Sequence, residues 1–154
     1  MAVKKPLANY SGKIDELHAG DLISGDVTGF TGKNVNASPV TLGMPVYKSS
    51  TLTEVDLANA TDDTKNCIGF VGESSIASAA SGYIQTSETI TLADWTAIAG
   101  AATLTPDARY FLSATAGKIT ATSPSTSGNI SQIVGKAVSP TELLVTIRER
   151  ILLA

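Results

Sequence analysis

The sequence predicts an all-β protein: a compact β-sandwich or β-barrel of short antiparallel strands, with one short helix at about residues 92–98. Thirteen glycines and six prolines break the chain into short runs, which disfavours long helices. Several of these runs alternate polar and apolar residues, the pattern of a strand with one buried face. Hydrophobic residues make up 43% of the chain, so a folded core is expected.

The chain is expected to divide into an arm, a domain and a tail. Residues 1–13 lack apolar periodicity and predict an N-terminal arm. Residues 14–149 predict a single β-rich domain, and residues 150–154 form an apolar C-terminal tail. The tail is expected either to pack on its own domain or to reach a neighbouring molecule, because its apolar side chains are unfavourable in water. The candidate attachment residues are Lys4, Lys5, Leu7, Tyr10, Ile151, Leu152 and Leu153.

Residues 14–47 predict short strands joined by loops. Within them, residues 29–34 superficially resemble a phosphate-binding loop, but the pattern fails. Val27 stands where the first glycine belongs, and Asn34 where Ser or Thr belongs. The sequence therefore predicts a hairpin loop at this position.

The middle of the chain predicts three strands of different kinds. Residues 44–48 predict an edge strand, because Pro45 cannot donate to a β-ladder. Residues 53–57 alternate and predict a half-buried strand, whereas the continuous apolar run 67–71 predicts a fully buried one. Cys67, at the start of that run, is expected to be a buried free thiol.

One segment has helical spacing. Leu92, Trp95 and Ile98 fall on one face of a short helix, for which Thr91 is the expected N-cap and Gly100 the expected end. Trp95, the single tryptophan, is expected to anchor the core.

The C-terminal third gives the clearest strand pattern. Residues 109–113 and 118–122 predict a hairpin, since a short glycine-containing linker joins two β-prone runs. Residues 130–138 predict a strand interrupted at Gly135, and residues 143–147 predict the last strand of the domain. The sequence of about residues 40–75 weakly resembles that of about residues 104–147. Either a duplicated β-unit or chance repetition explains this internal similarity.

Composition disfavours several classes of function. The net charge of −3 and the pI of about 5.0 argue against nucleic-acid binding. One histidine, His18, and one cysteine leave no metal site rich in these ligands and no internal disulfide. No signal peptide or membrane-spanning run is apparent, which is compatible with folding in a bacterial cytoplasm. We expect no catalytic residues, no cofactor, no nucleic acid and no membrane partner.

A string of turn and strand residues resembles a known module. It comprises residues 95–100, 104–113, 117–120 and 134–145, together with the earlier 43–47 and 68–71. The pattern, which covers about residues 40–153, is similar to one in tailed-bacteriophage head-fibre, capsid-decoration (cement) and tail-fibre proteins. The chain departs from it at Asp107, where glycine is expected, because a type II turn requires a positive φ there.

The resemblance implies a structural virion protein made in the bacterial host cytoplasm. Its expected place is the capsid exterior, where it would bind the major capsid protein as a homotrimer and stabilise the shell. One alternative is a receptor- or glycan-binding head- or tail-fibre component with exposed aromatics such as Tyr47, Tyr83 or Tyr110 in a shallow pocket. A small hydrolase is the third and least favoured hypothesis.

Overall fold

The computed structural model describes residues 6–8, 14–16, 28–49 and 53–154. Near the N-terminus, β1 (Pro6–Ala8) pairs antiparallel with β2 (Ile14–Glu16), and Leu7 lies opposite Asp15. The predicted attachment residues Lys4, Lys5 and Tyr10 lie outside the described residues, as does His18.

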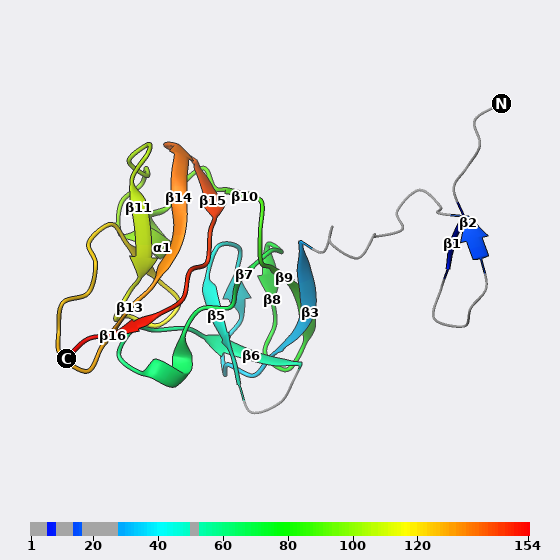
Figure 1. Ribbon diagram of the computed structural model, residues 1–154, viewed down its shortest axis with the longest axis horizontal. Helices are drawn as coiled ribbons and strands as arrows, with labels where there is room; N and C mark the ends of the chain where they lie inside the picture. The colour runs from blue at the N-terminus through cyan, green and yellow to red at the C-terminus, as the bar shows by residue number, and fades with distance from the viewer. Residues whose placement is uncertain (1–5, 9–13, 17–27, 50–52) are drawn as a thin grey trace.

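The body of the protein is built almost wholly from short strands, which confirms the all-β prediction (Figure 1). We call residues 29–85 the first unit and residues 89–145 the second unit. The first unit contains β3 (Gly29–Asn34), β4 (Val40–Thr41), β5 (Pro45–Lys48), β6 (Glu54–Leu57), the 3-10 helix η1 (Asp63–Lys65), β7 (Gly69–Val71), β8 (Ser75–Ile76) and β9 (Ser81–Gln85). The second unit contains β10 (Thr89–Thr91), α1 (Thr96–Ala99), β11 (Arg109–Leu112), β12 (Ile119–Thr120), β13 (Ile130–Ser131), β14 (Ile133–Ser139) and β15 (Glu142–Val145), and β16 (Ile151–Leu152) follows it.

The first unit is a closed barrel in the order β3-β6-β5-β7-β9. The prediction of a hairpin loop at residues 29–34 was wrong, because these residues form β3. This strand pairs antiparallel with β9 and parallel with β6, so it closes the barrel. The glycines that suggested a loop instead permit close packing: a Cβ on Gly32 would lie 2.8 Å from Ile84 Cγ1.

The prediction of an edge strand at residues 44–48 was also wrong. Strand β5 lies between β6 and β7 and pairs with both. Pro45 is tolerated because it is the first residue of the strand, where its missing N–H removes no interior ladder bond. Its carbonyl oxygen still accepts a hydrogen bond from the Ala58 N–H at 3.0 Å.

The second unit forms a five-stranded sheet in the order β10-β15-β14-β11-β12. If the barrel of the first unit is opened between β3 and β6, its strand order becomes β3-β9-β7-β5-β6. These strands correspond in turn to β10, β15, β14, β11 and β12 of the second unit. The second unit stays open at the corresponding position, between β10 and β12, and α1 contacts β12 there. The origin of the predicted halves, about 40–75 and 104–147, by repetition stays a prediction.

The corresponding strands β5 and β11 are entered through the same turn. The Met44 N–H donates to the Thr41 carbonyl at 3.1 Å, and the Ala108 N–H donates to the Thr105 carbonyl at 3.1 Å. The third residue of each turn has a positive φ, +85° at Gly43 and +65° at Asp107. Asp107 therefore adopts the conformation that a type II turn requires, although glycine is absent.

The helix is shorter than predicted. It spans Thr96–Ala99 rather than about 92–98, and Thr91, the expected N-cap, ends β10 instead. The predicted end at Gly100 is confirmed, since its φ is +76° and its N–H donates to the Thr96 carbonyl at 3.1 Å. Trp95 is fully buried and its Nε1 donates to the Thr141 carbonyl at 3.1 Å, so its predicted place in the core is also confirmed.

Two apolar clusters form the core. The smaller lies inside the barrel and contains Val40, Val46, Val55, Val71, Ile76 and Ile84. The larger fills the second unit and also includes Phe70 and Cys67, which come from the first unit. The two units are therefore joined through a shared apolar core.

We expect Asp107→Val to lower the Tm by several degrees, because a β-branched residue at φ near +65° is strained. Asp107→Asn is the control, since Asn tolerates this conformation and the exposed ion pair that it loses contributes little. Thermal unfolding followed by circular dichroism measures both, and equal Tm values for the two variants would contradict the expected strain.

Candidate binding surface

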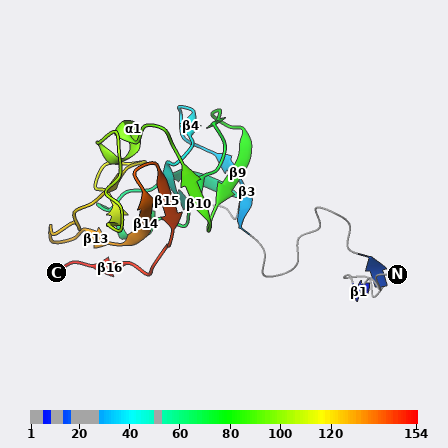
Figure 2. The same cartoon turned by 90° about the horizontal axis from the view of Figure 1, so that it is seen from above.

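The C-terminal tail is tied to the domain through its backbone. Strand β16 pairs antiparallel with β13, with Ile130 opposite Leu152. The Leu153 N–H donates to the Asn129 carbonyl, and the Gly128 N–H donates to the Leu153 carbonyl, both at 2.8 Å. Both ribbon views show the chain leaving β15 and running to β16 beside β13 (Figures 1 and 2). The tail thus packs on its own domain.

The side chains of this strand are nevertheless presented to solvent. Ile151 is 66% exposed and Leu152 is 60% exposed, whereas Leu153 is half-buried. The backbone pairing holds two consecutive large apolar side chains in an ordered strand, where they point to opposite faces. Both are exposed, which makes this strand a candidate for contact with another molecule.

A buried glutamine fixes the start of this tail. The side chain of Gln132 is 2% exposed and its Oε1 accepts from the Cys67 N–H at 2.8 Å. Its Nε2 donates to the Cys67 and Arg148 carbonyls, both at 3.0 Å. One amide therefore joins the first unit, the second unit and the segment that leads into the tail. The strand break predicted at Gly135 is wrong, because β14 runs through Gly135 and the break falls at Gln132.

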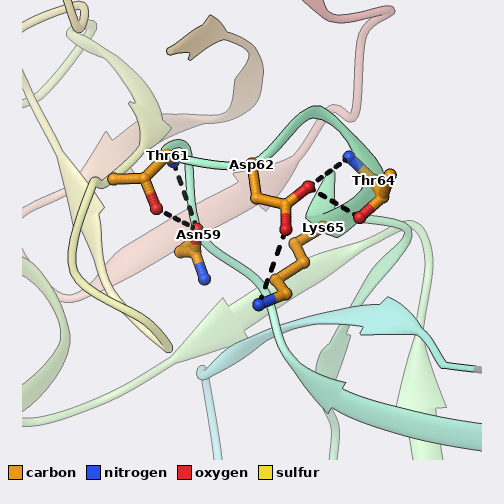
Figure 3. Close-up of polar contacts among 5 residues, drawn as sticks. All are labelled: Asn59, Thr61, Asp62, Thr64 and Lys65. Carbon is orange, nitrogen blue, oxygen red and sulfur yellow. Dashed lines mark hydrogen bonds and ion pairs between the residues drawn. The ribbon is translucent and has the colours of Figure 1, made fainter. Parts of the chain in front are cut away.

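A polar loop at residues 59–65, whose internal contacts Figure 3 shows, is hydrogen-bonded to β13. Asp62 accepts from the Thr64 N–H at 2.9 Å and from the Thr64 hydroxyl at 2.6 Å, and Lys65 Nζ lies 3.6 Å from Asp62 Oδ2. The hydrogen bonds from Thr64 and the charge of Lys65 lower the pKa of the Asp62 carboxyl. The structured loop then accepts the Ile130 N–H at the Ala60 carbonyl, at 2.8 Å.

Two open hollows lie along the C-terminal segment, and the first of them reaches the tail. The first, of about 760 Å³, is lined by Asp63, Asn66, Cys67, Ile68, Gln132, Ile147, Arg148, Glu149, Arg150 and Leu152. The second, of about 410 Å³, is lined by Arg109, Ile133, Gly135, Lys136, Leu144, Thr146 and Arg148. Arg148 lines both hollows, so they form one continuous surface along the C-terminal segment.

The charge on this surface is mainly positive. Arg109, Lys136 and Arg148 surround the smaller hollow. Lys136 Nζ lies 2.8 Å from Asp107 Oδ1, and this hydrogen bond together with the lysine charge lowers the pKa of the Asp107 carboxyl. Across the described ranges neither Arg109 nor Arg148 forms an ion pair, so both charges face the hollow without a neutralising carboxylate.

The tyrosines proposed for a glycan pocket are not displayed as expected. Tyr110 is buried, and its hydroxyl accepts from the Thr105 N–H at 3.0 Å. Tyr83 is half-buried, with its hydroxyl 2.6 Å from the Thr28 hydroxyl, and Tyr47 is half-buried against the larger core cluster. Burial therefore removes Tyr110 from a shallow glycan pocket, whereas Tyr47 and Tyr83 are partly exposed.

Sequence reasoning singled out Ile151 and Leu152 as candidate contacts but not the basic residues of the smaller hollow. Arg109, Lys136 and Arg148 lie on three different segments, and only sheet pairing brings them together. One signal was available, since residues 144, 146, 148, 150 and 152 alternate with the period of an extended chain and all line a hollow.

Within the described ranges no group of three or more His, Cys, Asp or Glu side chains is placed to hold a metal ion. The helices described there include none long and apolar enough to cross a membrane. No protein-family model matches the chain, and no curated protein matches its sequence.

We expect Gln132→Leu to lower the free energy of unfolding by about 2–4 kcal/mol, because it leaves the buried N–H and carbonyl of Cys67 without partners. Ser131→Ala, one residue away and half-buried, should change it by less than about 0.5 kcal/mol. Urea unfolding of both variants tests this, and a similar small loss in each would show that the amide is dispensable.

Burial raises the pKa of the Cys67 thiol to about 12 from its ordinary value of 9.0. The thiol thus stays protonated in the folded protein at a pH where the unfolded chain ionises. Its contribution to stability is present below pH 9 and is lost as the pH rises toward 12, by up to about 1.4 kcal/mol per pH unit. We expect wild-type protein to lose stability more steeply than Cys67→Ala in urea titrations between pH 8 and about pH 11; parallel curves would contradict this.

Proposed function

We propose that the protein is a non-enzymatic structural component of a bacteriophage particle. It binds the outer surface of the capsid as a decoration or cement protein and stabilises the shell. Its partners are the major capsid protein and other copies of itself, arranged as a homotrimer. Two lines of support meet here: the resemblance over residues 40–153, and the exposed apolar strand at the C-terminus.

The observation that carries the proposal is the ordered display of Ile151 and Leu152. Their backbone is already paired with β13, so binding a partner would order little additional chain. Preorganisation of this kind leaves more of the contact energy available as affinity. Fully covering the two side chains would contribute about 1.5–3 kcal/mol each.

A modest contact is sufficient when it is repeated. A trimer would present three such strands to a shell that itself repeats the same site. Simultaneous engagement raises the overall affinity well above that of a single contact. This suits a protein that must hold neighbouring capsid subunits together.

The test uses capsids that lack the protein and measures saturable binding of the purified chain. We expect Ile151→Ser/Leu152→Ser to weaken binding by roughly a hundredfold, because about 3 kcal/mol of apolar contact is lost. The backbone pairing of β16 with β13 involves no side chains and is retained. Val35→Ser, at an exposed position in the first unit, is the control and should bind like wild type.

Two results would count against the proposal. Absence of saturable binding by the wild-type chain would reject capsid decoration, and unchanged binding by the double serine variant would reject the tail as the contact. A deletion of residues 1–13 tests the predicted arm separately. Sedimentation of the wild-type chain as a monomer at all concentrations would reject the homotrimer.

A further inference from the structure

The outer sheet faces of the two units correspond in position but differ in burial. The face of the first unit is covered by the second unit, whereas the face of the second unit is exposed. In the first unit, Pro45 pairs with Phe70, and Phe70 pairs with Gln85. Residues that pair directly across strands share one face of a sheet. This row faces the second unit: Phe70 is fully buried in the larger core cluster, and Gln85 Nε2 lies 3.3 Å from the Thr89 carbonyl oxygen that accepts from it.

The matching row of the second unit has no such cover. Arg109 pairs with Lys136, Lys136 pairs with Leu144, and Leu144 pairs with Thr89. These four residues are exposed, including Leu144 at 38%. The second unit therefore presents to solvent the same sheet face that the first unit uses to pack against a neighbouring β-unit.

The chemistry of the uncovered row differs from that of the covered one. Positions taken by Pro45 and Phe70 in the first unit are taken by Arg109 and Lys136 in the second. Arg148 adds a third cation at the rim of the same hollow. The acidic side chain in direct contact with these cations is Asp107, which is bound to Lys136.

We propose that this outer face of the second sheet docks an acidic segment of a protein partner. Charge complementarity selects the partner: carboxylates would pair with Arg109 and Arg148, while an aliphatic side chain of the segment would rest on Leu144 and Ile133. The inference rests on the proposed function in one respect, since it assigns this segment to the capsid.

A protein segment fits this face better than an anionic glycan. Aliphatic side chains lie among the cations, and they suit a peptide that carries both apolar and acidic residues. The described tyrosines, whose rings could stack on a sugar, are buried or half-buried away from this hollow. The experiment below distinguishes binding of an acidic peptide from binding of an anionic glycan.

The experiment measures fluorescence anisotropy of a labelled poly-L-glutamate peptide with the full chain. Arg109→Gln/Arg148→Gln is compared with Lys48→Gln/Lys118→Gln, which removes the same charge from exposed positions outside both hollows. We expect the arginine variant to bind roughly tenfold more weakly and the lysine variant to stay within about twofold of wild type. Equal thermal unfolding of the variants ensures that folding does not explain the difference.

Equal loss in both variants, or no binding by the wild-type chain, would overturn the inference. Tighter binding of polygalacturonate than of poly-L-glutamate would overturn it in favour of a glycan. Repeating the comparison on capsids separates it from the proposed function. Capsid binding that is insensitive to the arginine substitutions would reject this docking face and leave capsid decoration standing. Peptide binding at the arginines without any capsid binding would support this docking face and reject capsid decoration.

Discussion

A single buried amide holds the candidate binding surface in place. Gln132 interrupts the strand pattern between β13 and β14 and satisfies both backbone groups of Cys67 together with the Arg148 carbonyl. A buried backbone group without a partner is costly, so these segments are fixed relative to one another. The hollows, the cations and the apolar strand all adjoin the segment that this amide fixes.

The pairing of β16 with β13 has one effect on the backbone of the tail and another on its side chains. An unpaired edge at β13 would invite association through its free backbone groups, and β16 covers that edge. In β16, Ile151 and Leu152 stay exposed on opposite faces of the strand. The tail therefore covers the backbone edge of β13 and leaves these two side chains accessible.

The two units use one strand order for different purposes. The first closes into a barrel because Gly29 and Gly32 let β3 approach β9 closely, and its outer face packs into the shared core. The second remains open, is filled by Trp95 and Ile98, and leaves its outer face uncovered. The two units share a strand order, but only the outer sheet face of the second unit is left exposed.

The sequence by itself determined the all-β class, the 109–113 and 118–122 hairpin, the burial of Cys67 and Trp95, and the end of the helix at Gly100. Alternation, turn residues and capping act over a few residues, so they can be read locally. Only the three-dimensional fold shows that residues 29–34 form a strand, that β5 is paired on both sides, and that Arg148 lies against Gln132 and shares a hollow with Arg109. These outcomes depend on pairing between distant segments, and local sequence carries no record of which strand will lie alongside.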